Sequence, residues 1–303
     1  MKFKKKSLLE IRNMTIDEVS KYYVELRKYE YDNKIPLKGI NIRNKIHKLL
    51  VELVRIERKL NDETLMVIND ERVKSENSKI YVCTHAGGND IQRTFEAIKE
   101  PAYLFLGDPK EAYRDATGLL LYFNGVICME SSDKTDRKIA KERAIELLNK
   151  GGNLLIYPEG AWNITPNLPV MKLFKGAVTM AKETGADIIP VAIEQYENNF
   201  FVSIGKNIIM DDVKDMSIVE INHIVRNMMA TQKWNIWERM GTHSRKNVAC
   251  TTLEEFQEEI VNKCEYDFTI QDVLDTMYKD KNTPTYEEVF KPVKEIVKKK
   301  SSN

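Results

Sequence analysis

The sequence has no long apolar run and no excess of charge of either sign. Its longest apolar stretch, residues 118–129, contains Asn124 and is shorter than the roughly 20 residues that a membrane-spanning helix needs. The basic residues 1–6 are not followed by the apolar core of a signal peptide. Lys and Arg number 47 and Asp and Glu number 46, so no overall field favours nucleic acid as a partner. We therefore expect a chain that neither spans a membrane nor binds nucleic acid.

Cysteine is scarce as well, and the four cysteines form no C-x-x-C pair. Cys83 and Cys128 lie within apolar runs, where a buried, reduced thiol is expected, whereas Cys250 and Cys264 lie near the end of the chain. This usage predicts a cytoplasmic location. Lysines cluster at residues 4–6 and 298–300, which indicates either contact with an anionic membrane surface or ordinary solvated chain ends.

Two helices are predicted before residue 75. Thr15-Ile-Asp-Glu18 has the pattern of a capping box and begins a helix that runs to residue 31. A second helix covers residues 41–60, where apolar residues recur every three or four positions. That stripe indicates either a face packed on a core or an amphipathic helix lying on a membrane.

From residue 78 onward, predicted strands and helices alternate. Strands are expected at residues 79–84, 102–106, 125–129, 153–157, 187–193 and 200–204, and helices at 91–99, 110–123, 137–150, 175–184 and 216–232. This alternation predicts an α/β domain with a mostly parallel central sheet flanked by helices. We expect an N-terminal helical segment over residues 1–75, the α/β domain over 76–232 and a helical C-terminal extension over 233–303.

The segment His85-Ala-Gly-Gly-Asn-Asp90 lies at the predicted end of a strand, where functional groups of such folds gather. On a continuous helix, side chains five positions apart point about 140° apart, so this pair can meet only across a turn, which Gly87 and Gly88 permit. A carboxylate that fixes the tautomer of an imidazole leaves its other nitrogen free to take a proton. Alternatively, Asp90 only caps the next helix and His85 is an ordinary strand-end residue.

Three further segments follow in order: Gly125-Val-Ile-Cys-Met-Glu130, Tyr157-Pro-Glu-Gly160 and Ile189-Pro-Val-Ala-Ile193. In order and spacing, the four segments resemble the signatures of the glycerolipid acyltransferases, the superfamily of 1-acylglycerol-3-phosphate and lysophospholipid acyltransferases. Leu173-Phe-Lys-Gly-Ala177 also resembles an element that follows the third signature in that family. The resemblance covers residues 78–205 and depends most on H-x4-D being followed by Y-P-E-G.

The resemblance implies a role for each matching residue. His85 is the general base that deprotonates the acceptor hydroxyl, and Asp90 orients it. Pro158, Glu159 and Gly160 form the acceptor wall, with Glu159 accepting hydrogen bonds from acceptor hydroxyls.

The resemblance also implies a donor. The acyl donor is a diffusing thioester, acyl-CoA or acyl carrier protein (ACP), so no bound cofactor and no metal are expected. Ile189-Pro190-Val191 lines the donor or acyl side. Backbone N–H groups near Gly87 and Gly88 are candidate donors for the oxyanion.

The sequence departs from the family pattern in two places. Family members that use a phosphate-bearing acceptor have an arginine where this chain has Ser131, and serine cannot replace its charged fork. We therefore assign Ser131 and Lys175 to substrate binding, with Lys134, Arg137 and Lys172 as other sources of a cation, or else the acceptor lacks a phosphate there. Trp162 stands where a basic residue is usual and either stacks on a flat, sugar-like face or fills the core.

The remaining histidines, His47, His223 and His243, have no partners at metal-ligand spacing, which favours core or solvated positions. The sequence thus predicts an O-acyltransferase that acts on a lysophospholipid-like acceptor, resting peripherally on the inner face of a membrane through helix 41–60. Two alternatives stay open. One is a hydrolase that uses the same His85–Asp90 pair to activate water, and the other is a non-catalytic module that binds an acyl chain or a carrier protein.

Overall fold

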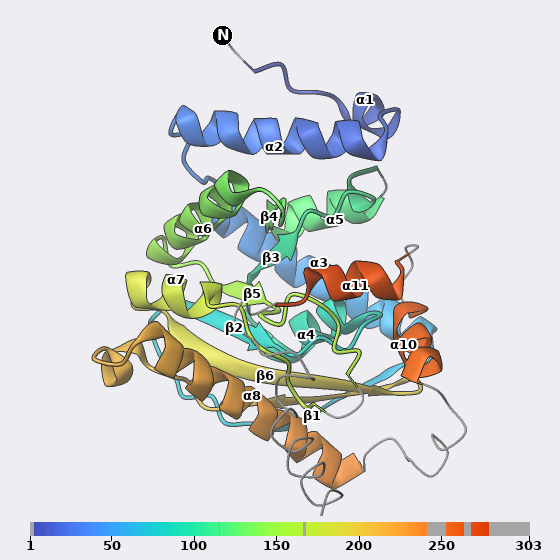
Figure 1. The fold of residues 1–303 in the computed structure, drawn as a ribbon, viewed down its shortest axis with the longest axis vertical. Helices are drawn as coiled ribbons and strands as arrows, with labels where there is room; N and C mark the ends of the chain where they lie inside the picture. Colours follow the sequence, from blue (N-terminus) through green and yellow to red (C-terminus); the bar gives the residue numbers. More distant parts are fainter. Residues whose placement is uncertain (1–2, 115, 166–167, 241–252, 264–267, 279–303) are drawn as a thin grey trace, which may run out of the picture.

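The computed structural model describes residues 3–114, 116–165, 168–240, 253–263 and 268–278 (Figure 1). Within them, seven strands form one sheet in the order β1-β7-β6-β2-β5-β3-β4. All neighbouring strands are parallel except β6 and β7, which form an antiparallel hairpin. The strands are β1 (Thr64–Asp70), β2 (Lys79–Cys83), β3 (Tyr103–Gly107), β4 (Val126–Met129), β5 (Leu154–Ile156), β6 (Asp187–Tyr196) and β7 (Asn199–Ile204). The predicted α/β class with a mostly parallel sheet is confirmed.

The helices follow the predicted order closely. They are α1 (Leu8–Arg12), α2 (Ile16–Asp32), α3 (Ile40–Leu60), α4 (Asp90–Ile98), α5 (Ala116–Asn124), α6 (Lys134–Asn149), α7 (Gly176–Thr184), α8 (Ile218–Met240), α10 (Leu253–Val261) and α11 (Ile270–Thr276), with short 3-10 helices at Ala112–Arg114 and Met210–Val213. The predicted capping box begins α2, because the Thr15 side chain accepts the N–H of Glu18 and the Glu18 carboxylate accepts the N–H of Thr15. Cys250, Cys264, His243 and lysines 298–300 lie outside the described residues.

The sheet is the middle of three layers. Side chains alternate between its faces, as the pleat of a strand requires: Ile80 and Val82 of β2 pack with α6, α7 and α8, whereas Tyr81 and Cys83 pack with α4. Helix α3 packs against both α4 and α5, and α5 also contacts β3. All three helices contribute residues to the apolar cluster on that second face. Helix α2 lies beyond the β4 edge (Figure 1). Arg27 of α2 forms ion pairs with two buried carboxylates, those of Asp108 just after β3 and of Asp136 in α6.

Three parts of the structure differ from the prediction. Strand β1 lies inside residues 1–75, which we expected to be helical. Its apolar residues, Leu65 to Ile68, are consecutive, so the two-residue alternation of a half-buried strand is not visible in them. Helix α8 runs to Met240, so the boundary expected at residue 232 falls within a helix. The predicted helix at 110–123 is divided, with α5 as its second part.

The order of the strands decides which motifs meet. Strand β2 lies in the centre of the sheet between β5 and β6, and all three are parallel. The residues that follow β2 and β5 therefore leave the same edge of the sheet side by side. This brings the segment that begins at His85 next to the segment Tyr157 to Gly160.

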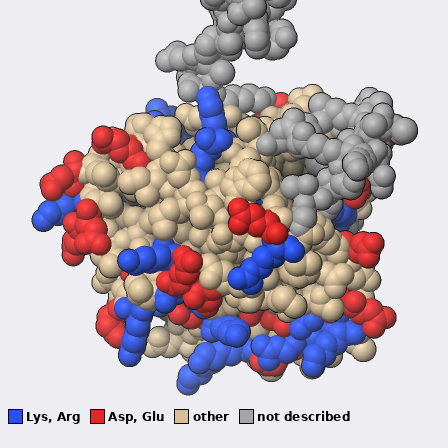
Figure 2. Space-filling model, turned by 90° about the horizontal axis from the view of Figure 1, so that it is seen from below, with Lys and Arg blue, Asp and Glu red and all other residues tan. Residues whose placement is uncertain are grey.

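Charges of both signs occur on the face of the molecule that lies below α8 in Figure 1. Figure 2 shows acidic and basic side chains interspersed there, with basic side chains gathered along one edge. Opposite charges at short range cancel beyond about a Debye length, roughly 8–10 Å at moderate salt. This face therefore does not present the broad single-sign field that a polyanion requires.

His47 lies in the core between α3, α4 and α5. Its Nδ1 is 2.7 Å from Asn124 Oδ1, and its ring meets Phe95 edge-on at 5.0 Å between centroids. Burial lowers the pKa of His47 below its ordinary value, because the charged imidazolium loses its hydration there. The folded protein therefore resists protonation of this ring.

Acid is expected to destabilise the fold through His47. In the unfolded chain the imidazole gains its proton near pH 6.5, so the stability present above that pH is lost as the pH falls below it, by up to about 1.4 kcal/mol per pH unit for one proton. Urea unfolding of the wild type and of His47→Gln at pH 7.5 and pH 5.5 checks this. The variant should lose less stability on acidification, and an equal loss in both proteins would contradict the assignment.

Candidate active site

His85 and Asp90 meet at the carboxyl end of β2. The two glycines between them have positive φ angles, 87° at Gly87 and 58° at Gly88, and turn the chain so that Asp90 begins α4. His85 Nδ1 lies 2.6 Å from Asp90 Oδ2. The same oxygen accepts the backbone N–H groups of Ala86 at 2.7 Å and Gly87 at 2.9 Å. The predicted turn and the predicted side-chain pair are both present.

This arrangement fixes the tautomer of the imidazole. An ionised carboxylate only accepts hydrogen bonds, so Nδ1 carries the proton and Nε2 keeps its lone pair. Asp90 is fully buried, whereas the His85 side chain retains 15% of its exposure. Asp90 therefore holds the imidazole of His85 at Nδ1, and Nε2 remains able to accept a proton.

Two aromatic rings flank the imidazole. The Tyr157 ring lies 4.3 Å from it between centroids and is tilted by 31°, and the Trp162 ring lies 5.9 Å away and nearly perpendicular. The Tyr157 hydroxyl donates to Thr94 Oγ1 at 3.2 Å, and burial raises its pKa well above the ordinary value. Tyr157 thus stays protonated and supports the ring from within the core, while Trp162 is only partly buried.

The Pro158–Gly160 corner follows β5 and is joined to His85 by Glu159. This carboxyl group is fully buried; one oxygen accepts the N–H of Met171 at 2.7 Å and the other accepts the N–H of His85 at 3.4 Å. Burial raises the pKa of Glu159 above its usual value, against the lowering effect of these N–H donors and of Lys233. Both oxygens thus bind backbone groups of this chain, and the contact of Glu159 with an acceptor hydroxyl stays a prediction.

Pro158 and Gly160 shape the corner. Pro158 is buried, and its carbonyl accepts the N–H of Phe174 at 2.8 Å. Gly160 is exposed and adopts a φ of 76°, and a Cβ there would collide with the Phe174 ring. Glycine is therefore required both for the backbone angle and for the close packing.

The known proteins to which this chain is similar are acyltransferases. Residues 64–194 match the family model named Acyltransferase. Over 93 residues the chain is 34% identical to the 1-acyl-sn-glycerol-3-phosphate acyltransferase of Borreliella burgdorferi, which covers 31% of this chain and 35% of that protein. Over 119 residues it is 26% identical to a chloroplastic enzyme of the same name from Arabidopsis thaliana, which covers 39% of this chain and 32% of that protein. Residues 64–194 are therefore similar to known acyltransferases, in agreement with the resemblance of the four segments to the glycerolipid acyltransferases.

A solved structure supports the fold of the acyltransferase domain. The crystal structure of the 1-acyl-sn-glycerophosphate acyltransferase PlsC from Thermotoga maritima superposes with a TM-score of 0.54 at 15% identity, covering 76% of this chain and 95% of that one. The alignments with the curated relatives span about a third of their length. The family match begins at residue 64, the first residue of β1, and thus before residue 76, where we predicted the start of the α/β domain.

The other two predicted substrate-binding residues, Ser131 and Lys175, are both exposed. Ser131 follows β4, which is three strand positions from β2, or roughly 14 Å at the usual spacing. It is exposed, and its carbonyl accepts a hydrogen bond from Arg137. Lys175 is exposed at the start of α7. The strand order therefore brings together His85, Asp90 and Glu159, but not Ser131.

The carboxylate before Ser131 is held by a cation. Glu130 lies 2.9 Å from Lys110 Nζ and accepts hydrogen bonds from the N–H and hydroxyl of Ser132. Burial alone would raise the pKa of Glu130, but the Lys110 and Ser132 contacts outweigh it and lower the pKa to about 2. Glu130 is therefore ionised at neutral pH.

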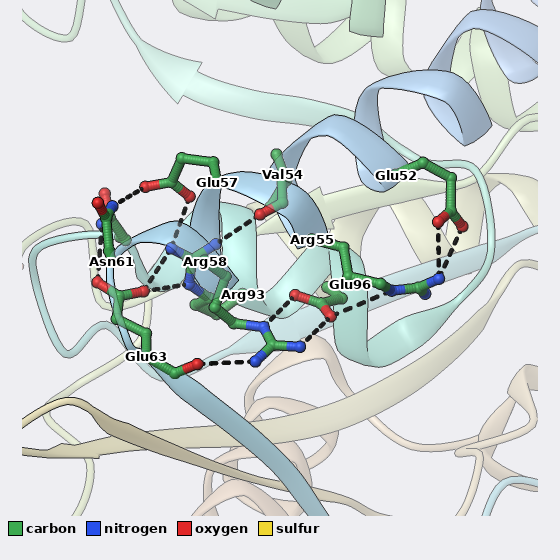
Figure 3. A network of polar contacts seen from close by, with 10 residues as sticks. Glu52, Val54, Arg55, Glu57, Arg58, Asn61, Glu63, Arg93 and Glu96 are labelled. Carbon is green, nitrogen blue, oxygen red and sulfur yellow. Dashed lines mark hydrogen bonds and ion pairs between the residues drawn. The ribbon is translucent and has the colours of Figure 1, made fainter.

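An ionic network supports the His85–Asp90 turn from outside (Figure 3). Arg93, one turn along α4 from Asp90, is fully buried and binds Glu63 and Glu57. Glu63 also accepts from Asn89, inside the turn, at 3.4 Å. Arg58 and Arg55 of α3 bind Glu96 of α4. This network was not predicted from the sequence, in which the charged Arg93 within the predicted helix 91–99 was the one local sign of it.

Metal-ligating side chains are not clustered in the described residues. Histidine, cysteine, aspartate and glutamate side chains there form no group of three suited to a metal ion. Nε2 of His85 is the atom available for proton transfer. The imidazole lies next to the turn at Gly87 and Gly88 and to the aromatic rings of Tyr157 and Trp162.

Proposed function

We propose that this protein is an O-acyltransferase that moves a fatty acyl group from acyl-CoA or acyl-ACP to a hydroxyl of a lysophospholipid-like acceptor. The observation that carries the proposal is the 2.6 Å contact between His85 Nδ1 and Asp90 Oδ2 at the edge where the Pro158–Gly160 corner also emerges. Its setting in a glycerolipid acyltransferase domain and the names of the relatives support it.

In the proposed reaction, His85 Nε2 takes the proton of the acceptor hydroxyl as its oxygen attacks the thioester carbonyl carbon. The new C–O bond forms, the C–S bond breaks, and the proton passes from the imidazolium to the leaving thiolate. The ionised Asp90 stabilises the imidazolium through Nδ1. No covalent intermediate on the protein is required, and the N–H groups beside Gly87 and Gly88 are our candidates for binding the oxyanion.

Two observations favour different headgroups for the acceptor. The relatives are named for 1-acyl-sn-glycerol-3-phosphate, which favours lysophosphatidate. Ser131 in place of the family arginine favours an acceptor without a phosphate at that point. We place lysophosphatidate first and use uncharged acceptors as the comparison.

The test is a two-way panel with purified protein. Acyl-CoA and acyl-ACP are each incubated with lysophosphatidate, lysophosphatidylcholine, monoacylglycerol, glycerol 3-phosphate or a sugar, and both thiol release and product mass are measured. Thiol release that depends on the acceptor, with the acylated product, supports the proposal. Release that no acceptor changes would instead identify a hydrolase, and a thioester that binds without being consumed would identify an acyl-binding module.

We also propose that α3 and α5 rest on the membrane that holds the lipid substrates. Five apolar residues on one side of α3 are each more than half exposed: Ile42, Leu49, Leu53, Ile56 and Leu60. On α5, which packs against α3, four more are exposed: Leu119, Leu120, Tyr122 and Phe123. Such a continuous apolar surface is typical of a helix lying in a bilayer interface. In the described residues no helix is both long and apolar enough to cross a bilayer. Cysteine usage predicts a cytoplasmic location, and contact with the cytoplasmic face of the membrane stays a prediction.

Polar substitution of this surface should weaken membrane binding. The double variant Leu49→Asn, Leu53→Asn is expected to reduce the fraction that sediments with anionic liposomes about tenfold or more, because each leucine inserted contributes about 1.5–3 kcal/mol. The matched control is Met216→Asn, Val219→Asn, which changes two exposed apolar residues near the start of α8, on the other face of the sheet. Equal sedimentation of the two double variants would contradict the proposed surface.

A further inference from the structure

The loop that follows the Pro158–Gly160 corner is covered by the C-terminal helices. Its side chains Ala161, Ile164 and Met171 are buried in a separate apolar cluster with Ile260 and Val261 of α10 and with Val273 of α11. The side chain of Gln257, on α10, donates to the carbonyl of Ile164 at 3.4 Å. Without α10 and α11, these loop side chains would face water. The shape of the loop therefore depends on a segment that lies outside the residues matched by the family model.

The same segment approaches the backbone of the turn between His85 and Asp90 and that of the Pro158–Gly160 corner. The position that a Cβ would take at Gly87 is 3.5 Å from the carbonyl oxygen of Ile260, and that at Gly88 is 3.5 Å from the carbonyl oxygen of Lys263. At Gly160 the corresponding distance to the Thr276 carbonyl oxygen is 3.1 Å. The C-terminal segment thus reaches the catalytic turn and the corner together.

A line of aromatic rings joins His85 to this segment. Trp162 meets His85 edge-on at 5.9 Å and Phe268 edge-on at 5.4 Å between ring centroids. Phe174, beside Gly160, meets Tyr278 at 5.2 Å. Edge-to-face pairs of this kind hold rings in a defined orientation. Trp162 is therefore held near the imidazole from the C-terminal side.

We propose that α10 and α11 are a wall of the active site that holds Trp162 against His85 and keeps water from the imidazole. The proposal depends on the function proposed above, in which His85 must deprotonate a hydroxyl of the acceptor rather than water. An apolar wall beside the base excludes competing water, and the acyl group then passes to the acceptor. The wall determines the ratio of transfer to hydrolysis.

Two variants loosen the wall to different degrees. Val273→Asp places a carboxylate in the buried cluster, which detaches α11, and Phe268→Ala removes only the exposed partner of Trp162. The control is Gln271→Asp, which introduces the same charge at an exposed position of the same helix. Far-ultraviolet circular dichroism of all three proteins establishes that the domain stays folded, and Phe268→Ala carries the test if Val273→Asp does not fold.

The first readout is the accessibility of His85. Diethyl pyrocarbonate modifies exposed neutral imidazoles, and the rate at His85 is followed by peptide mass spectrometry. We expect His85 to be modified about tenfold faster in Val273→Asp. The free energy cost of burying a carboxylate without a partner exceeds the equivalent of a tenfold change, so α11 detaches and exposes the imidazole. A smaller increase is expected in Phe268→Ala and none in Gln271→Asp. Equal rates of His85 modification in the wild type and all three variants would contradict the proposed wall.

The second readout is the fate of the thioester. Acyl-CoA is offered with lysophosphatidate, and the thiol released is compared with the acylated product. Loss of the wall should raise the share of thiol released without product in the two wall variants and leave it unchanged in the control. An unchanged share despite faster modification of His85 would overturn the proposed effect on water. If no form consumes thioester while modification still rises, the proposed function fails and the covering role of α10 and α11 stands.

Discussion

Replacing His85 by alanine is expected to lower the rate of acyl transfer by about 10²–10⁴-fold, the usual contribution of a positioned general base. The remaining rate would come from holding donor and acceptor close together, which the substitution leaves intact. Measuring kcat and KM for both substrates checks this, and the loss should fall on kcat. The turn itself should survive, because Asp90 keeps its hydrogen bonds from Ala86 and Gly87.

The control for this prediction is His223→Ala. His223 lies exposed on α8, so its removal tests the loss of an imidazole without touching the pair. Asp90→Asn adds a second comparison, since an amide can keep the shape of the turn but does not stabilise an imidazolium. Transfer by His85→Ala at the wild-type rate would remove this histidine from the mechanism.

The substitution Arg93→Met is expected to lower the free energy of unfolding by about 3–5 kcal/mol, as happens when one partner of a buried ion pair is removed. Arg93 is fully buried, and its loss leaves Glu63 inside the protein without its main cation. Urea unfolding at pH 7 measures the effect. Because Glu63 also holds Asn89 within the His85–Asp90 turn, we expect acyl transfer to fall in the folded fraction as well.

Arg55→Met is the matched control, because it removes the same side chain from the same network (Figure 3). Arg55 is 37% exposed, and exposed ion pairs usually contribute at most about 1 kcal/mol. A similar loss of stability in both variants would mean that burial does not decide the strength of this network.

Local signals in the sequence predicted the parts of the structure that depend on near neighbours. The capping box at Thr15 and Glu18, the alternation of strands and helices, and the turn at Gly87 and Gly88 each involve residues a few positions apart. The meeting of His85 with the Pro158–Gly160 corner also followed, because parallel strands leave one edge of a sheet.

The features that were missed depend on distant neighbours. Glu159 is a motif residue whose burial between the N–H groups of His85 and Met171 follows only from the packing of two loops. The burial of Arg93 was missed because its ion-pair partners, Glu57 of α3 and Glu63 after it, are distant in the sequence. The contacts of α10 and α11 with the corner join residues about a hundred positions apart, and no local pattern encodes them.

The pairing of β1 with β7 has a consequence for the order in which the chain is completed. Strand β1 ends at Asp70 and its partner begins at Asn199. At about 5–20 residues per second, a ribosome needs roughly ten seconds to make the residues between them. During that interval the peptide groups of β1 have no neighbouring strand. The sheet edge that emerges first from the ribosome is therefore finished last, when the second half of the hairpin arrives.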